Sequence, residues 1–353
     1  MTTITIDRRQ FNKAMQAAMA VAHHQTNIPV LNTIRATANG SLALEATDLD
    51  VGLRAEVPYE GEHTSFLIPD PRKVSAAINA AGGATASFGV IDDKTLAVSA
   101  ADFAAQLKTI PVDDFPAFSG VAEEDFAAEM TAADFAQIAR VFPAISKEGT
   151  RYYLNGVSIS KVGEWTWRFA ATDGHRLMMV EVPLPGATGL IPDKTIVPRQ
   201  FMTLVARHFA KTDKPLRLAY GPTVRRNDID VTLPIGSGAH RMALQGWAGD
   251  AKVTMVTKLI DGAYPDIERV VPQDIKLAAR MDRAQLIRAA NTVGALASLK
   301  TRALKLTFCD GSVSVSLNSP DLGEGSFALP CAHNLPNGSS VGFNANYLTA
   351  DRK

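Results

Sequence analysis

Two side chains of metal-ligand type, Asp173 and His175, lie two positions apart in a segment that reads ATDGHRL. Carboxylate and imidazole groups at this spacing could hold a metal ion for hydrolysis. However, no further cluster of His, Asp or Glu recurs at metal-ligand spacing, and a related segment has Asp48-Leu49-Asp50, without the His. Asp173-Gly174 also reads as a turn between strands. A metal-dependent hydrolase is therefore the weaker interpretation, and we predict no catalytic residue, metal or cofactor.

The overall composition is that of an ordinary globular protein. The chain has 353 residues, of which 46% are hydrophobic and 20% charged. The cysteines, Cys309 and Cys331, are too few for a disulfide framework and lack metal-ligand spacing, so we expect them to be reduced and buried. No apolar run reaches the ~20 residues of a membrane span, and the start Met1-Thr2-Thr3-Ile4 has no signal-peptide core. We expect a cytoplasmic protein without a membrane partner.

The elements that must position these residues form a repeat. Ala46-Thr47-Asp48 is followed, ten residues after the Asp, by Pro58, and Ala171-Thr172-Asp173 by Pro183 at the same distance. A fainter third copy turns at Asp310-Gly311-Ser312 and ends at Pro330. Internal repetition of this kind indicates an array of similar domains.

Each repeat contains two strand-to-helix steps, each followed by alternating apolar and polar strands. The first two copies are complete by this pattern, and the third stops inside its second helix, at Lys353. The predicted fold class is α+β, and the predicted domains are 1–122, 123–271 and 272–353, with the second half of the third missing. The long stretch between Pro215 and Lys258 is predicted to be an extended hairpin with no assigned role.

Charge separates by element type, although the net charge is zero. Six helices are predicted from apolar periodicity, and together they carry a net charge of +10, so the remainder carries −10. None contains a Glu, although Glu favours helices. Helices on one side of the sheets would form a basic surface that attracts a polyanion. The six ranges are 7–24, 69–83, 134–147, 198–214, 281–300 and 344–353.

The first helix is predicted to bury one face and expose the other. Phe11, Met15, Ala18, Met19 and Ala22 recur at helical spacing for packing on a sheet, which leaves Arg9, Lys13 and Gln16 outside. The exposed faces are also expected to carry small residues, which suit loose phosphate contact better than reading of base edges. These small residues are Ala17, Ala20, Ala76, Ala80 and Ala295.

Several motifs together resemble one family. Thr150-Arg151-Tyr152-Tyr153-Leu154-Asn155-Gly156, the ATDGHRL segment, Ile196-Val197-Pro198-Arg199 and Gly342-Phe343-Asn344 look like the bacterial sliding clamps, the β subunits of DNA polymerase III. The resemblance runs from the N-terminus to Lys353. It implies a DNA-clamp fold of three similar domains, each made of two strand–helix–strands halves, with helices lining a pore and sheets outside.

The resemblance also implies a non-catalytic function in DNA replication. Two chains of such a clamp join head to tail around duplex DNA, independently of its sequence, and act as a processivity factor. The implied partners are the DNA polymerase III catalytic subunit, the clamp loader and repair proteins, which insert short hydrophobic peptides. Implied DNA contacts are Lys147, Arg151, Tyr152, Tyr153 and Arg199, with His24 and Gln25 where the family has a basic residue.

The residues that match the family's peptide pocket would give it an apolar floor and polar groups that orient a peptide backbone. They are Leu154, Thr172, Gly174, His175, Arg176, Leu177, Pro265, Val270, Asn344 and Tyr347. The matching dimer contacts are Lys73, Ala77, Leu107 and Leu296. Because the third domain is cut short in this sequence, a second alternative is a non-ring accessory or competitor clamp that binds DNA or partners without encircling DNA.

Overall fold

The computed structural model describes residues 2–22, 26–116, 125–187, 191–221, 223–226, 229–232, 240–274, 276–297, 302–319 and 322–349. The chain divides into two compact units, Met1–Tyr264 (unit 1) and Pro265–Lys353 (unit 2). Unit 1 contains the first sequence repeat and most of the second, and unit 2 contains the end of the second and the third. The predicted boundaries at 122/123 and 271/272 stay predictions.

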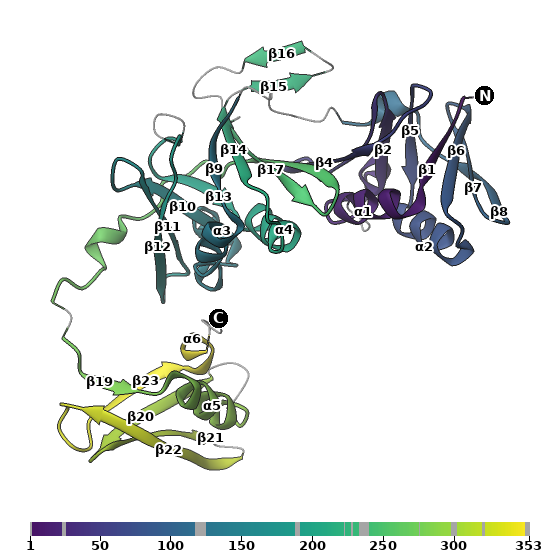
Figure 1. Ribbon diagram of the computed structural model, residues 1–353. Helices are drawn as coiled ribbons and strands as arrows, with labels where there is room; N and C mark the ends of the chain where they lie inside the picture. Colours follow the sequence, from purple (N-terminus) through teal and green to yellow (C-terminus); the bar gives the residue numbers. More distant parts are fainter. Residues whose placement is uncertain are drawn as a thin grey trace. The chain divides into compact units, whose positions relative to one another are not determined.

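An eight-stranded antiparallel sheet runs through both repeats of unit 1 (Figure 1). Its central pair joins β4 of the first repeat to β18 of the second, with Glu56 opposite Lys252 and Val51 opposite Thr257. The repeats therefore share one sheet, a pairing that the sequence analysis did not predict. In spatial order its strands are β5 (Thr64–Pro69), β2 (Thr33–Ala38), β3 (Ser41–Thr47), β4 (Val51–Pro58), β18 (Ala251–Lys258), β17 (Arg241–Ala248), β14 (Leu216–Gly221) and β9 (Phe126–Met130).

Each repeat of unit 1 also has its own four-stranded sheet. In spatial order the first contains β1 (Thr2–Asp7), β6 (Thr85–Asp92), β7 (Thr95–Ala100) and β8 (Phe103–Lys108). The second contains β12 (Leu177–Pro183), β11 (Thr166–Thr172), β10 (Gly156–Lys161) and β13 (Thr195–Pro198). Within the stretch predicted as an extended hairpin, β15 (Thr223–Arg226) and β16 (Ile229–Thr232) form a separate pair, while β14, β17 and β18 belong to the eight-stranded sheet.

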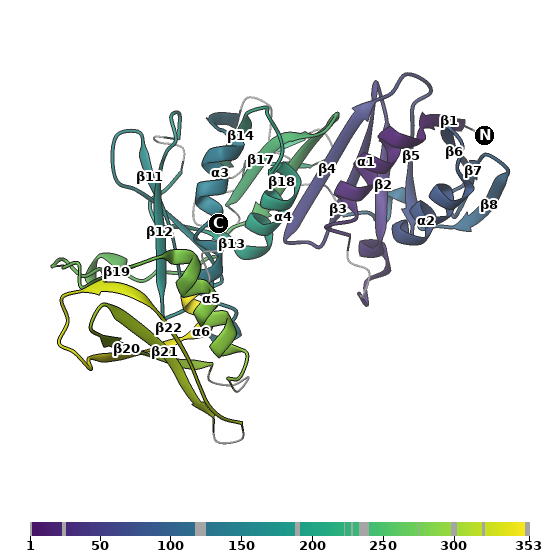
Figure 2. The same ribbon diagram turned by 60° about the horizontal axis from the view of Figure 1, so that its bottom comes forward.

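Four helices lie in a row along one side of unit 1, as Figures 1 and 2 show. Helices α1 and α4, from different repeats, both pack on β18, and their buried side chains join one hydrophobic core. The expectation that the helices share a side of the sheets thus agrees with the arrangement in unit 1. The helices are α1 (Arg8–Ala18), α2 (Pro71–Ala81), α3 (Ala132–Ala139) and α4 (Arg199–Phe209).

Unit 2 has one helix-covered sheet in the order β19-β22-β21-β20-β23. Helix α5 packs on β20, β21 and β22, and α6 follows β23. Its elements are β19 (Ala279–Met281), α5 (Arg283–Gly294), β20 (Ala303–Cys309), β21 (Ser312–Ser319), β22 (Gly323–His333), β23 (Ser340–Asn344) and α6 (Ala345–Leu348). The expectation for the cysteines is half right, because Cys331 is buried while Cys309 is exposed, and both are free thiols.

All six predicted helices exist, but they are shorter than predicted. Asp7 caps α1 by accepting hydrogen bonds from the amides of Arg9 and Gln10, and the helix gives way to turns after Ala18. Helix α3 begins two residues before the predicted start, because Thr131 and Asp134 form a capping box. One exposure prediction was wrong: Ala17 is 2% exposed and belongs to the core.

A ladder of polar residues crosses the outer face of the eight-stranded sheet. Glu45 is 2% exposed and pairs with Arg35 at 2.5 Å and with Arg54 at 3.2 Å. Burial lowers the pKa of Arg54, but attraction to Glu56 and Glu45 outweighs it, so that the pKa is raised overall. In the second repeat the ladder continues through Thr254, Gln245, Arg217 and Glu129.

Three further polar contacts join the repeats across the β4–β18 seam. Lys13 of α1 pairs with Asp250 in the turn after β17, and Gln200 of α4 donates to Asp48 in the turn after β3. Lys258 pairs with Asp50 in that same turn at 3.0 Å. Each repeat thus sends a hairpin turn to the other repeat's helix. None of the helices in the described ranges is long and apolar enough to cross a membrane.

Candidate functional site

The predicted peptide-binding turn, Thr172 to Arg176, is held by its own side chains. The Asp173 carboxylate accepts from the amides of His175 and Arg176 at 3.0 and 3.1 Å, and the Thr172 hydroxyl donates to the Arg176 carbonyl at 2.7 Å. Gly174 adopts φ +85°, which glycine accommodates without strain. Asp173 therefore has a structural role in this turn. Among the residues that the structure describes, no group of three His, Cys, Asp or Glu could hold a metal ion.

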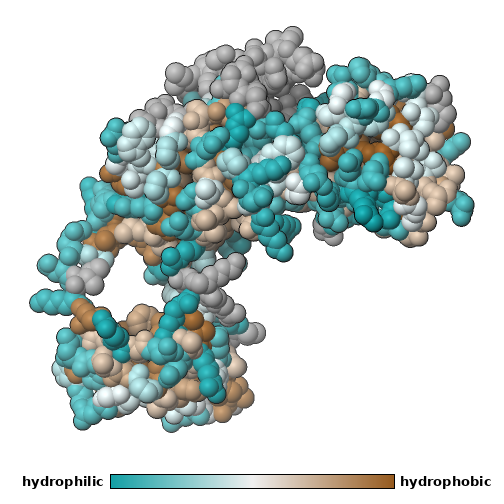
Figure 3. Space-filling model, in the orientation of Figure 1, coloured by the Kyte–Doolittle hydropathy of each residue, from teal (hydrophilic) through white to brown (hydrophobic). Residues whose placement is uncertain are grey.

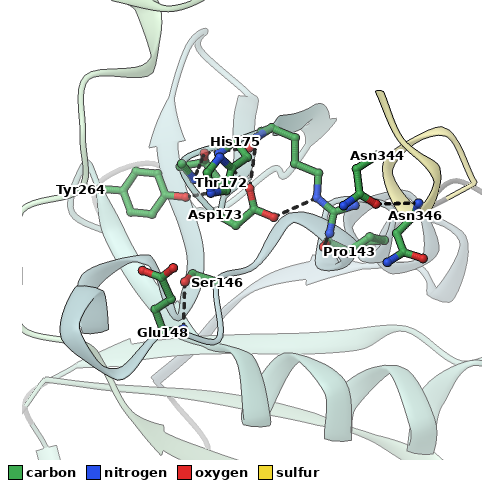
Figure 4. Close-up of polar contacts among 11 residues, drawn as sticks. Pro143, Ser146, Glu148, Thr172, Asp173, His175, Tyr264, Asn344 and Asn346 are labelled. Carbon is green, nitrogen blue, oxygen red and sulfur yellow. Dashed lines mark hydrogen bonds and ion pairs between the residues drawn. The ribbon is translucent and has the colours of Figure 1, made fainter. Parts of the chain in front are cut away.

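Two hydrogen bonds to residues distant in the sequence fix the turn to the rest of unit 1 (Figure 4). The Arg176 guanidinium donates through Nε to Asp173 at 3.0 Å and through Nη2 to the carbonyl of Pro143, which lies in the 3₁₀ helix Phe142–Ala144. On the other side, the amide of Thr172 donates to the Tyr264 hydroxyl at 2.9 Å. These contacts leave Gly174 and His175 exposed at the tip of the turn.

The remaining predicted pocket residues divide between the two units. In unit 1, Leu154 is 3% exposed and Leu177 is half-buried, as expected of an apolar floor. In unit 2, Pro265 is exposed and Val270 is 67% exposed. Also in unit 2, Tyr347 is half-buried, and the Asn344 side chain caps α6 by accepting from the Asn346 amide at 2.9 Å.

The predicted DNA-contacting loop is the 3₁₀ segment Gly149–Leu154. Tyr152 is 54% exposed and meets the half-buried Tyr153 edge to face, with ring centroids 5.9 Å apart. Gly262 lies against this pair, because a Cβ added there would come within 2.9 Å of the Tyr153 Cβ and 3.5 Å of the Tyr152 ring. Tyr152 is therefore available for contact with a ligand, whereas Tyr153 anchors the loop.

Arg151 extends from this loop toward the peptide-binding turn. Its Nε lies 3.6 Å from a Glu148 carboxylate oxygen, and its Nη1 would be only 2.7 Å from a Cβ added to Gly174. The loop and the turn are therefore neighbours, and glycine at position 174 leaves room for the guanidinium.

A basic cleft of about 520 Å³ brings together two predicted DNA contacts, Lys147 and Arg199. The sequence analysis did not identify Arg207, which lies about two turns after Arg199 on α4 and also lines the cleft. Burial, followed by the charge of Arg207, lowers the pKa of the neighbouring His208. The other lining residues are Ala20, Ser146, Asn155, Gln200, Thr203 and Leu204.

All charged residues that line this cleft are cations, and its other lining residues are uncharged. Three cations on one concave surface suit a phosphate backbone, because they attract it without reading base edges. Hydrophilic residues also cover much of the visible surface of unit 1 (Figure 3). His24 and Gln25, the remaining predicted DNA contacts, lie outside the described residues.

The predicted dimer contacts lie on strand β8, on helix α2 and in the turn after α5. Leu107 is on β8, the last strand of its four-stranded sheet, while Lys73 and Ala77 are on α2. In unit 2, Leu296 is 44% exposed, and its Cδ1 lies 3.0 Å from the Cβ position of Gly325 on β22. Because β19 pairs only with residues 331–333, the earlier part of β22 has an open edge among the described strands.

Comparisons with known proteins agree on one family. The DNA polymerase III β subunit models match residues 2–119 with the N-terminal domain and residues 132–266 with the central domain. The β sliding clamp of Caulobacter vibrioides is 29% identical over 367 residues, covering 98% of this chain and 88% of the relative. That of Escherichia coli K12 is 27% identical, with the same coverage.

Solved sliding-clamp structures have the same fold. The crystal structure of a DNA polymerase III β subunit from Bartonella birtlesii bound to griselimycin has a TM-score of 0.83 and 25% identity, covering 98% of this chain and 88% of that one. The Caulobacter crescentus clamp has a TM-score of 0.83 and 26% identity, with coverage of 99% and 88%.

Proposed function

Because this chain belongs to the family of the DNA polymerase III β subunit, the bacterial sliding clamps, we propose that it encircles duplex DNA as a head-to-tail homodimer. The family is a non-catalytic processivity factor of replication. In this proposal the chain tethers the polymerase III catalytic subunit, the clamp loader and repair proteins in the cytoplasm. The observation that carries the DNA part is the row of helices on one side of unit 1, with the basic cleft among them.

The DNA contact is proposed to be electrostatic and independent of sequence. Lys147, Arg199 and Arg207 would attract phosphates in the cleft, and the exposed Tyr152 would touch the duplex beside it. Each cation contributes a contact that weakens as salt rises. A closed ring does not need strong contacts, because topology retains the DNA while the protein slides.

The homodimer is proposed to form by joining open strand edges of two copies. Strand β8 offers unpaired backbone groups next to Leu107, and the first part of β22 offers them next to Leu296. Open edges favour pairing with a strand of another chain. Pairing β8 of one copy with β22 of the other is therefore the head-to-tail contact that we propose.

Partner peptides are proposed to bind at the Thr172–Arg176 turn. Exposed Gly174 and His175 and half-buried Leu177 give it polar groups beside an apolar floor. Val270 and Tyr347, in unit 2, are proposed as further peptide contacts. The bound segment would be short and would end in hydrophobic or aromatic residues.

The ring proposal is tested with the protein loaded by a clamp loader onto nicked circular DNA. We expect it to stay bound in high salt, where electrostatic contacts are screened, and to be released when the circle is linearised. The matched control is the same protein on DNA that is linear from the start. Equal release from circular and linear templates would contradict encirclement and would favour the non-ring accessory.

A further inference from the structure

The amide of Thr172 lies beyond the end of the hydrogen-bonded ladder between β10 and β11. Thr172 pairs with Leu177 of β12, but on its other side the pairing of β11 with β10 ends at Ala170, so Thr172 lies beyond the last pair of that ladder. Its hydroxyl is engaged by the Arg176 carbonyl and the Gly174 amide, at 2.7 and 3.1 Å. A backbone donor beside a buried core needs a partner from outside the ladder.

Tyr264 supplies that partner. Its hydroxyl oxygen lies 2.9 Å from the Thr172 nitrogen, and the residue is only 6% exposed (Figure 4). Burial raises the pKa of Tyr264 to about 12, while the hydrogen bond from Thr172 acts in the opposite direction. The phenol is therefore neutral at neutral pH and presents a fixed acceptor to the amide.

The segment that carries Tyr264 is itself held in place. The amide of Ile260 donates to the carbonyl of Ile196 at 3.0 Å, which ties the segment to β13. Two residues later, Gly262 packs against the Tyr152 ring and the Tyr153 Cβ. Tyr264 thus reaches the turn from a backbone that is anchored at two earlier points.

We propose that Tyr264 is a positioning residue of the peptide site, acting through the Thr172 amide to hold the turn that presents Gly174 and His175. This inference rests on the proposed peptide-binding function and adds a residue that makes no contact with the peptide. Removal of the acceptor leaves the Thr172 amide without its partner, so the turn samples other conformations and only a fraction of molecules can bind.

The test compares Tyr264→Phe with the wild type, by titration with a fluorescent synthetic peptide that ends in Leu-Phe. We expect roughly tenfold weaker binding, which corresponds to about 1.4 kcal/mol. Hydrogen exchange measured by mass spectrometry should become faster in the segment around Thr172. Tyr59→Phe is the matched control, because Tyr59 is also buried, at 7% exposure, but lies in the first repeat.

Three outcomes separate the inference from the function on which it rests. Unchanged affinity and unchanged exchange in Tyr264→Phe would overturn the positioning role while leaving the peptide site intact. Equal loss of affinity in Tyr264→Phe and Tyr59→Phe would also overturn it, because the effect would then be general. If the wild type itself fails to bind the peptide, the proposed peptide site is wrong and the inference falls with it.

Discussion

Asp48 and Asp173 occupy equivalent turns in the two repeats of unit 1 and make the same backbone contacts. Asp48 accepts from the amides of Asp50 and Val51 at 3.0 and 2.7 Å, as Asp173 does from the amides two and three positions later. The second carboxylate oxygen differs, because that of Asp48 accepts from Gln200 and that of Asp173 from Arg176. One turn thus closes the seam between repeats, while the other keeps an exposed tip.

Substitution of Gly174 by Ala should weaken peptide binding. The new Cβ would meet Arg151 at 2.7 Å, and Ala at φ +85° is strained, so the turn and the arginine must both shift. Gly40→Ala is the control, because Gly40 has φ +67° but nothing lies within 4 Å of its Cβ position. We expect both variants to lose about 1 kcal/mol or more of folding stability. Only Gly174→Ala should lose peptide affinity, and equal affinities in the titration would contradict the prediction.

Replacement of Leu49 by Gly should stabilise the protein. Leu49 occupies the position equivalent to Gly174 and has φ +80°, although its side chain is 46% exposed. Relief of this backbone strain is worth about 1–3 kcal/mol, against about 0.5–1 kcal/mol for the greater freedom of glycine in the unfolded chain. Thermal unfolding should show a raised Tm. Leu322→Gly, at a more exposed leucine without positive φ, should show no such gain.

Glu45→Ala should be strongly destabilising. The buried carboxylate neutralises Arg35 and Arg54, and its removal leaves both cations without this partner in a partly buried place. Breaking a buried ion pair from one side costs about 3–5 kcal/mol. Chemical denaturation would measure the loss, with Glu62→Ala at an exposed position as the control. A loss below that of the control would show that the network contributes nothing.

Arg207→Gln should reduce DNA binding and its salt dependence. Removal of one phosphate contact should lower the slope of log K against log salt by about 0.9, equally for all sequences. The measurement is a salt titration with linear duplex DNA, using Lys161→Gln on the exposed end of β10 as the control. An unchanged slope in Arg207→Gln would remove the cleft from the DNA-binding surface.

Leu107→Asp should prevent the proposed dimer. Leu107 is partly buried and packs against the core of its own repeat, and burial of an unpaired charge on this face of β8 costs several kcal/mol. Sedimentation would report a monomer for this variant and a dimer for Ile91→Asp, since Ile91 is exposed on β6 of the same sheet. Dimerisation of both variants to the same extent would rule out the β8 edge.

Much of the candidate site follows from local patterns. The hydrogen bonds inside the two Ala-Thr-Asp turns follow from the sequence, because the short side chain of Asp reaches the amides two and three residues ahead. The prediction that α1 exposes Arg9, Lys13 and Gln16 was also right. The clamp family was predicted from motifs that lie in order along the chain, and the family models over residues 2–119 and 132–266 confirm it. Local chemistry and internal repetition were therefore the informative signals.

Long-range relationships were not visible in the sequence. The β4–β18 pairing joins strands far apart in the chain, and nothing in Glu56 or Lys252 marks them as neighbours. Lys13 looked like a free surface cation, yet it pairs with Asp250. Ala17 was assigned to the wrong face because alanine suits both core and surface. The end of α1 was missed because no Gly or Pro follows Ala18 directly.

The sheet shared by the two repeats has a mechanical consequence. A bend at the β4–β18 seam would break a run of backbone hydrogen bonds, the contacts of Lys13, Gln200 and Lys258 with the facing turns, and a common core at the same time. These losses are cooperative, so the described parts of the two repeats in unit 1 move together as one body. In an assembly that opens to admit DNA, we therefore expect the β4–β18 seam to stay closed and the opening motion to occur at another place.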